Sequence, residues 1–289
     1  MANPLGTAYL DGDYLPLADV RVSPLDRGFL FGDGVYEVIP VYDGRLFRLD
    51  QHLRRLAYSL DAIRLPDPYS AARWQEVLNG LVARNGGGMQ SIYLQVTRGV
   101  GVGRDHRFPA EVTPTVFALS QELVPVSATY LDNGMETVTA EDIRWRRCDI
   151  KSISLLGNIL LRQQAEDAGA AETILLCDGC ATEGSSSTLF VVTADGKVRT
   201  PPKDNRLLPG ITRDLILELA HGAGLDCEEA EIPAAELASF PEVWLASSLR
   251  EVLAVTRIDG APVGDGRPGP AWRRVHALFQ QYKQTLAAA

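Results

Sequence analysis

The spacing of apolar residues along the chain predicts five amphipathic helices. Apolar side chains that recur every three or four residues lie on one face of an α-helix. Leu49, Leu53, Leu56 and Leu60 follow this spacing, and Asp50 is a candidate cap for the helix that they form. Four more helices are expected at 74–82, 155–168, 212–220 and 272–286. Their apolar faces supply much of the expected core.

Short runs rich in β-branched and aromatic residues predict strands between these helices. Asp-Gly pairs recur along the chain, and such a pair between two strand-like runs is a strong signal for a hairpin turn. Hairpins are expected across the pairs that begin at Asp11, Asp43 and Asp195. Further strands are expected at 91–97, 115–120, 173–177, 243–246 and 252–258. Antiparallel pairing is therefore a large part of the predicted fold.

This mixture of hairpins and intervening helices predicts an α+β fold of two domains. The chain lacks the regular alternation of strand and helix that is typical of a doubly wound parallel sheet. Its 289 residues also suit about two domains. Val124, Pro125 and Val126 interrupt the pattern after a predicted strand. We therefore expect an N-terminal domain at 1–122, a linker at 123–129 and a C-terminal domain at 130–289.

The charge of the chain narrows the range of partners. It has 28 basic and 37 acidic residues and a net charge of −9, whereas nucleic acids and anionic membranes favour proteins with a basic face. No apolar run approaches the roughly 20 residues that a membrane helix needs. The first residues also lack the basic region and apolar core of a secretory signal. We expect a cytoplasmic protein that binds neither nucleic acid nor membrane.

Cys177 and Cys180 form a C-x-x-C motif, a pattern found at redox and zinc sites. Asp178 and Gly179 between them are a hairpin-turn signal, which would simply place the two cysteines on either side of a turn. The chain offers no second C-x-x-C and no H-x-x-x-H to complete a zinc site. We favour the turn and expect no metal site; a redox role is the alternative.

Lysine is rare, so candidates for an amine nucleophile can be compared one by one. Lys151 follows a strand-like run and precedes a predicted helix, among apolar and small residues. Burial there disfavours the charged form and would leave a nucleophilic neutral amine. Lys197 belongs to a turn, Lys203 to a proline-rich loop and Lys283 to the polar face of the last helix. A lysine that merely lies at the start of a helix is the alternative for Lys151.

Two other segments could hold an anion or a polar ring. Pro209 and Gly210 precede a predicted helix that Thr212 could cap, and backbone amides at a helix start favour phosphate. Glu183 opens a loop of glycine and three serines before an apolar strand. A glutamate there could pair with a ring nitrogen while the hydroxyl groups hold a phosphate. Each segment alone is a weak signal.

Taken together, these motifs resemble the fold-type IV pyridoxal phosphate enzymes. The motifs appear in one order, as D-R-G at 26–28, F-G-D-G-V-Y-E at 31–37, I-K-S at 150–152, T-E-G-S-S-S at 182–187 and G-I-T-R-D at 210–214. The resemblance covers about residues 8 to 260. It implies a smaller N-terminal α/β domain, a larger C-terminal domain with a mixed, barrel-like sheet, and a homodimer.

The resemblance assigns a pyridoxal 5′-phosphate site. Lys151 is similar to the lysine that forms a Schiff base with the cofactor and then moves the substrate proton, and Glu183 to the acid that keeps the ring nitrogen protonated. The H-x-x-R-L spacing from His52 selects Arg55 as the phosphate arginine and leaves Arg54 exposed. The remaining residues implied to bind the cofactor are Ser187, Leu208, Gly210, Ile211, Thr212 and Ser248.

Within the family, the chain is most similar to D-amino acid aminotransferases. Arg104 and His106 resemble the R-x-H pair that holds the substrate α-carboxylate, together with the tyrosine that matches Tyr36. A guanidinium, an imidazole and a phenol make a directional carboxylate site. Arg250 could reach an acidic substrate side chain or simply be exposed, and we favour exposure.

The expected reaction is transamination between a D-alanine-like amino acid and a 2-oxo acid such as 2-oxoglutarate. Alternatives within the family are a branched-chain L-amino acid transaminase, an (R)-amine transaminase and an aminodeoxychorismate-lyase-like enzyme. Alternatives of another class are a binding protein without activity and an aldolase that forms its Schiff base without a cofactor.

Overall fold

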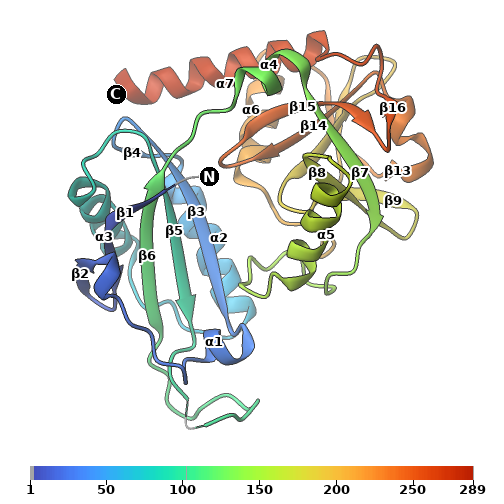
Figure 1. Ribbon diagram of the computed structural model, residues 1–289. Coiled ribbons are helices and arrows are strands. Elements are labelled where there is room, and N and C mark those ends of the chain that lie inside the picture. Colours follow the sequence, from blue (N-terminus) through green and yellow to red (C-terminus); the bar gives the residue numbers. More distant parts are fainter. Residues whose placement is uncertain (1–2, 102, 289) are drawn as a thin grey trace. The chain divides into compact units, whose positions relative to one another are not determined.

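The computed structural model describes residues 3–101 and 103–288, so that Val102 of the glycine-rich stretch lies outside the described residues. The contacts group the chain into two compact units (Figure 1). The first contains the chain up to Val124 together with Ile150–Leu155 and the last residues from Leu286. The second contains Pro125–Asp149 and Leu156–Thr285. The domain boundaries expected at 1–122, 123–129 and 130–289 stay a prediction.

The first unit is built on a six-stranded antiparallel sheet with the strand order β2-β1-β6-β5-β3-β4. Its strands are β1 (Pro4–Leu10), β2 (Asp13–Pro16), β3 (Gly34–Tyr42), β4 (Arg45–Leu46), β5 (Gln90–Thr97) and β6 (Thr115–Glu122). Asp11 and Asp43 adopt positive φ angles of 48° and 51° in the turns after β1 and β3. The hairpins expected at these two Asp-Gly pairs are confirmed.

Two long helices complete the core of the first unit (Figure 1). They are α2 (Leu49–Ala62) and α3 (Ala71–Arg84), and the unit also contains the short helices η1 (Leu17–Asp19) and α1 (Arg27–Phe31). Leu56 and Leu60 of α2 are buried against β3 side chains such as Ile39. The expected cap at Asp50 is wrong, because α2 begins at Leu49 after Arg48, which adopts a left-handed conformation.

The second unit contains a ten-stranded mixed sheet in which six strands close into a ring. The ring runs β10-β14-β15-β7-β8-β9 and closes where Thr188 of β10 pairs with Glu183 of β9. β7 runs parallel to both β15 and β8, and the other pairs of the ring are antiparallel. The ring strands are β7 (Met135–Glu141), β8 (Glu172–Cys177), β9 (Cys180–Gly184), β10 (Thr188–Val192), β14 (Glu242–Ser247) and β15 (Glu251–Ile258). Outside the ring lie β11 (Val198–Thr200), β12 (Cys227–Glu229), β13 (Ile232–Pro233) and β16 (Ala261–Pro262). The expected α+β fold with a mixed, barrel-like sheet is confirmed.

Successive side chains of the ring strands pack alternately into two hydrophobic cores. Leu189 and Val191 of β10 belong to a cluster that draws side chains from all six ring strands, as the interior of a closed barrel requires. Phe190 and Val192 point the other way and pack with two helices. The helices of this unit are α4 (Ala128–Asn133), α5 (Leu156–Asp167), α6 (Ile211–Gly222), η2 (Ala234–Ser239) and α7 (Pro270–Ala288), which belongs to this unit up to Thr285. In the part of the chain that the structure describes, no helix combines the length and apolar character needed to cross a membrane.

The C-x-x-C motif lies across the β8–β9 hairpin. Cys177 and Cys180 face each other in the strand register, and Asp178 adopts a φ angle of 50° in the turn between them. All four cysteines are free thiols. Burial raises the pKa of both hairpin thiols, which lowers the fraction of reactive thiolate at neutral pH. The interpretation of the motif as a turn is confirmed.

Candidate active site

Lys151 lies in a segment that is fixed to the first unit by its backbone. The Tyr36 amide donates a hydrogen bond to the Lys151 carbonyl at 2.9 Å, and Ser152 pairs with Val35 of β3. On the other side, the Lys151 amide donates to Ser59 Oγ of α2 at 3.2 Å. Ser59 is fully buried. The main chain around Lys151 is therefore held between β3 and α2, which leaves its side chain as the adjustable part.

The amine of Lys151 lies over an aromatic side chain. Its Nζ is 4.1 Å from the centre of the Tyr36 ring, and the Tyr36 ring stacks on that of Tyr93 with centres 5.6 Å apart. Burial raises the pKa of Tyr93 to about 12, so its hydroxyl stays protonated at neutral pH and donates to Gln95 Oε1 at 2.6 Å. Tyr93 was not among the predicted site residues. Its position within the strand expected at 91–97 was the available signal.

Arg55 is part of a buried cluster with Glu37 and His52. Its Nε and Nη2 donate to the two carboxylate oxygens of Glu37, each at 2.8 Å, and His52 Nδ1 lies 2.7 Å from Glu37 Oε2. His52 and Arg55 are three residues apart on α2 and so share one face, whereas Arg54 is exposed. The prediction that Arg54 is exposed on this helix is confirmed. The phosphate-binding role of Arg55 stays a prediction.

Burial and charge set the protonation states in this cluster. Burial alone would raise the pKa of Glu37, but Arg55 and His52 hold it well below its ordinary value. Burial lowers the pKa of His52, although Glu37 opposes the shift. His52 is therefore neutral at neutral pH, and its contact with the Glu37 carboxylate places the proton on Nδ1. The buried Nε2 atom has no partner among the described residues.

Glu183 lies at the end of β9 in the second unit and is held by two donors. Arg144 Nη1 donates to its Oε1 at 2.7 Å, and the Leu208 amide donates to its Oε2 at 3.1 Å. Asp142 orients Arg144 through a bidentate pair, with a contact of 2.8 Å to Nη2. Burial raises the pKa of Glu183, and Arg144 and the Leu208 amide counteract the rise. The sequence gives no signal for Arg144, because nothing near it distinguishes it from Arg146 and Arg147.

The serine loop and the start of α6 lie beside Glu183. Thr188 pairs with Glu183 across the closing point of the ring, and a side chain at Gly210 would come within 2.6 Å of Thr188 Oγ1. Ser187 Oγ is buried without a partner among the described residues. Thr188 also pairs with Ala246 of β14, two residues before the half-buried Ser248. The structure thus brings together the predicted second-unit residues of the cofactor site, namely Glu183, Ser187, Leu208, Gly210, Ile211, Thr212 and Ser248.

The first turn of α6 offers its backbone amides to a ligand. The helix begins at Ile211, and its N-cap Gly210 supplies no side-chain hydrogen bond. The expectation that Thr212 caps this helix is wrong, because Thr212 is a buried residue inside the first turn. Amides at an uncapped helix start favour an anion such as phosphate. The uncapped amides of α6 and the unpartnered Ser187 hydroxyl therefore fit a phosphate group.

Arg104 and His106 lie in an exposed loop of the first unit. The Arg104 guanidinium is 5.5 Å from the centre of the Phe31 ring, and the His106 ring centre is 5.3 Å from the same ring. The structure thus brings Arg104 and His106 together at Phe31. The Tyr36 ring has other partners, because it stacks on Tyr93 and contacts the amine of Lys151. The proposed joint action on a carboxylate stays a prediction.

Arg250 follows Ser248 in the turn after β14 and is partly exposed. Its Nη1 donates to the Ala171 carbonyl at 3.3 Å and lies 3.8 Å from Glu172 Oε2. Glu172 is fully buried, and the hydroxyl groups of Ser185 and Ser186 donate to it. Arg250 therefore stabilises the buried carboxylate beneath the serine loop while 39% of its side chain stays exposed.

Comparisons with known proteins identify similar sequences and structures. A family model described as amino-transferase class IV matches residues 34–258. The chain is 40% identical to a D-alanine aminotransferase of Bacillus licheniformis, over 93% of this chain and 94% of that protein. A branched-chain amino acid aminotransferase of Escherichia coli has a similar structure, with a TM-score of 0.91 and 27% identity, over 96% of this chain and 94% of that one. A branched-chain amino acid aminotransferase from T.th., solved with pyridoxamine 5′-phosphate, gives a TM-score of 0.89 and 25% identity, again over 96% of this chain and 94% of that one.

Because His52 is buried and neutral, we expect the folded protein to lose stability in acid. Because its pKa in the folded chain lies below the ordinary 6.5, the unfolded chain binds more protons once the pH falls below that value. We expect the free energy of unfolding to fall between about pH 7 and pH 5, by up to about 1.4 kcal/mol per pH unit from this group. His52→Asn retains an amide donor for Glu37 but does not titrate, so its stability should fall less steeply. Denaturant unfolding of both proteins across this range tests the expectation, and parallel curves would contradict it.

Proposed function

Because the chain belongs to the class IV amino-transferases, we propose that it transfers the amino group of a D-alanine-like amino acid to a 2-oxo acid such as 2-oxoglutarate. The observation that carries this proposal is the 40% identity to a D-alanine aminotransferase over nearly the whole of both chains. The similarity to the branched-chain enzyme of Escherichia coli is lower in sequence, at 27%. The R-x-H pair at Arg104 and His106 supports the same choice of substrate.

We propose pyridoxal 5′-phosphate as the cofactor, which supplies an electron sink when it is bound. Lys151 would join the cofactor through a Schiff base, and its freed amine would carry the proton that leaves the substrate Cα. Glu183 would face the ring nitrogen, since a neighbouring carboxylate favours the protonated ring. The open amides of α6, with Ser187, Thr212 and Ser248, would hold the phosphate, assisted by Arg55. The remaining contacts would come from Leu208, Gly210 and Ile211.

Substrate selection in this proposal depends on three side chains. Arg104 and His106 would bind the α-carboxylate together with the Tyr36 hydroxyl, and the position of that carboxylate decides which face of Cα presents its hydrogen to Lys151. Charge-assisted hydrogen bonds from a guanidinium give such a site both strength and direction. An amino acid and a 2-oxo acid share the carboxylate, so one clamp serves both half-reactions.

A second candidate is transamination of branched-chain L-amino acids. The TM-score of 0.91 with the Escherichia coli branched-chain enzyme favours it. Both reactions use the same cofactor chemistry and differ in where the substrate carboxylate is held. The two candidates are therefore separated by the productive amino donor.

We expect Lys151→Ala to abolish the visible absorbance of the Schiff base and to lower turnover by about 10²- to 10⁴-fold, as loss of a proton-transfer group does. Lys203→Ala is the matched control, because Lys203 pairs with Asp214 on the surface. Borohydride reduction followed by peptide mass spectrometry should place the cofactor on residue 151 in the wild type. A label on another lysine, or full absorbance in Lys151→Ala, would reject the assignment.

A panel of amino donors tests the substrate class. With 2-oxoglutarate as acceptor, we expect D-alanine to be productive, and L-leucine and an arylalkyl amine to be poor donors. Arg104→Ala should lower kcat/KM for D-alanine by about 10- to 100-fold, since a hydrogen bond to a charged group is lost. The affinity of the Arg104→Ala variant for the cofactor should equal that of the wild type. L-leucine as the best donor would favour the second candidate instead.

We propose that the enzyme is a homodimer, as the family resemblance implies. On α5, Leu156, Ile159 and Leu160 have exposures of 69%, 59% and 53%, and their spacing places them on one face of the helix. The preceding loop adds the exposed Ile143 and Trp145. An apolar patch of this kind on a protein surface is typical of an interface, and a second copy is its proposed occupant.

We further expect the enzyme to act in the cytoplasm. Its four cysteines are free thiols, and a reducing compartment preserves free thiols.

Ile159→Lys should shift the protein toward the monomer. A buried lysine in the proposed interface would lose its hydration, whereas Met89→Lys changes an exposed apolar side chain of the first unit and serves as the control. Size-exclusion chromatography with light scattering measures the molar mass of each variant. A monomeric wild type, or an unchanged dimer in Ile159→Lys, would count against this interface.

A further inference from the structure

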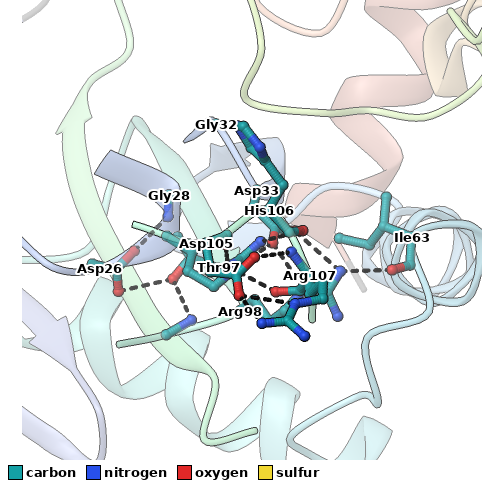
Figure 2. A network of polar contacts seen from close by, with 12 residues as sticks. Asp26, Gly28, Gly32, Asp33, Ile63, Thr97, Arg98, Asp105, His106 and Arg107 are labelled. Carbon is teal, nitrogen blue, oxygen red and sulfur yellow. Dashed lines mark hydrogen bonds and ion pairs between the residues drawn. The ribbon is translucent and has the colours of Figure 1, made fainter. Parts of the chain in front are cut away.

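The short helix α1 is firmly attached to the ends of two strands. Asp26 caps it by accepting a hydrogen bond from the Gly28 amide at 2.7 Å, and it also accepts from Thr97 Oγ1 (Figure 2). Thr115 Oγ1 donates to Asp26 as well. The Arg27 amide donates to the Gly99 carbonyl at 2.8 Å. A side chain at Gly28 would overlap Thr97. α1 is therefore a rigid base for the side chains that it carries.

Arg27 uses this base to hold the main chain of the loop at 104–107. Its Nη1 donates to the carbonyl of Asp105 at 2.6 Å and to that of Arg107 at 3.2 Å. Its Nη2 donates to the carbonyl of His106 at 3.4 Å. Arg27 is only 4% exposed. One buried guanidinium thus contacts three consecutive peptide units of an exposed loop that carries Arg104 and His106.

Asp33 neutralises Arg27 and connects it to a second buried arginine. Arg27 Nε donates to Asp33 Oδ2 at 2.8 Å, and Arg98 donates to both Asp33 oxygens at 2.9 and 3.0 Å (Figure 2). Arg98 also donates to the carbonyls of Ile63 and Arg64 after α2. A buried charge is stable only when it is paired and hydrogen-bonded, so the network fixes Arg27 in one orientation.

Phe31, at the end of α1, supports the side chains of the same loop. The guanidinium of Arg27 lies 4.8 Å from the centre of its ring and that of Arg104 lies 5.5 Å from it. The His106 ring packs on Phe31 at a centre distance of 5.3 Å. Arg27 therefore holds the backbone of the loop, and Phe31 contacts the two side chains that would bind a carboxylate.

We propose that Arg27 is a positioning residue for substrate carboxylate recognition, which holds the loop at 104–107 so that Arg104 and His106 present their donors in a fixed geometry. This inference rests on the proposed function, in which that pair binds the α-carboxylate. Arg27 itself has its donors directed to Asp33 and the loop carbonyls. It acts on the substrate only through the loop, and it does not act on the cofactor.

An arginine is required for this role. Its planar guanidinium presents five N–H donors in a fixed fork, which allows one side chain to bind Asp33 and several carbonyls together. A lysine in its place could retain the ion pair with Asp33, but its compact ammonium group cannot reach Asp33 and the loop carbonyls in the same way. Arg27→Lys therefore preserves the charge and removes the geometry.

The test measures carboxylate binding without turnover. Propionate, an unreactive carboxylate, is titrated into the cofactor-loaded enzyme while the cofactor absorbance is followed, and the cofactor affinity of the apoenzyme is measured separately. For Arg27→Lys we expect the Kd of propionate to rise about tenfold, as the loss of hydrogen bonds to three carbonyls suggests. The KM for D-alanine should rise similarly, with cofactor affinity within about twofold of wild type and with a smaller change in kcat.

Two further variants guard against a general loss of structure. Arg84→Lys makes the same substitution in the first unit at a side chain whose hydrogen bond ends on the Gly80 carbonyl of α3, so propionate affinity should stay near that of the wild type. Phe31→Leu retains an apolar side chain and removes the aromatic ring that contacts Arg104 and His106. It should weaken the binding of propionate without weakening the binding of the cofactor. Equal losses of propionate and cofactor affinity in Arg27→Lys and Phe31→Leu would overturn the inference.

The inference and the proposed function can fail separately. If Arg104→Ala leaves the affinity for propionate unchanged, the carboxylate clamp itself is wrong. If Arg104→Ala lowers the affinity for propionate and Arg27→Lys does not, the carboxylate site is supported and the positioning role of Arg27 is overturned.

Discussion

The hydrogen bonds between the segment at 150–155 and strand β3 are the constraint on which the proposed chemistry depends. The Tyr36 amide binds the Lys151 carbonyl, Ser152 pairs with Val35, and the Lys151 amide binds buried Ser59. A catalytic amine must be placed within a fraction of an ångström of its target, and a lysine side chain has too many rotatable bonds to achieve this alone. Backbone pairing removes the freedom of the main chain and leaves only that of the side chain. The aromatic face of Tyr36 then restricts the side chain further.

Buried arginine–carboxylate pairs organise each functional element in turn. Arg55 of α2 pairs with Glu37 of β3, Arg27 and Arg98 share Asp33, and Arg144 pairs with Glu183. Such pairs contribute little net stability, because both charges lose their hydration on burial. Removing one partner is costly, at about 3–5 kcal/mol, since the other charge stays buried and unpaired. The value of these pairs is therefore geometric: each fixes the orientation of a group that the proposed chemistry uses.

Local sequence patterns predicted the helices and hairpins well. They could not predict contacts between residues that are far apart in the chain. The periodicity of α2 was sufficient to place Arg55 inside and Arg54 outside, and the Asp-Gly pairs located the turns after β1 and β3. α1 is too short for a periodic signal, and Gly210 rather than Thr212 caps α6. Arg144 and Ser59 are recognised only from their partners Glu183 and Lys151, which lie 39 and 92 residues away in the chain. The resemblance supplied the residues predicted to bind the cofactor, but it did not supply Arg144 and Ser59, which hold Glu183 and Lys151.

The ion pair between Glu183 and Arg144 bears directly on the proposed role of Glu183 at the ring nitrogen. A carboxylate has about four lone-pair positions on its two oxygens. Arg144 uses one on Oε1 and the Leu208 amide uses one on Oε2, so each oxygen can accept a further hydrogen bond. Burial raises the pKa of Glu183 and favours the neutral acid, and Arg144 opposes this rise. A neutral acid could not stabilise a protonated ring, whereas a carboxylate anchored by Arg144 can. The arginine that competes for Glu183 is thus also the group that favours its carboxylate form, which the proposed role needs.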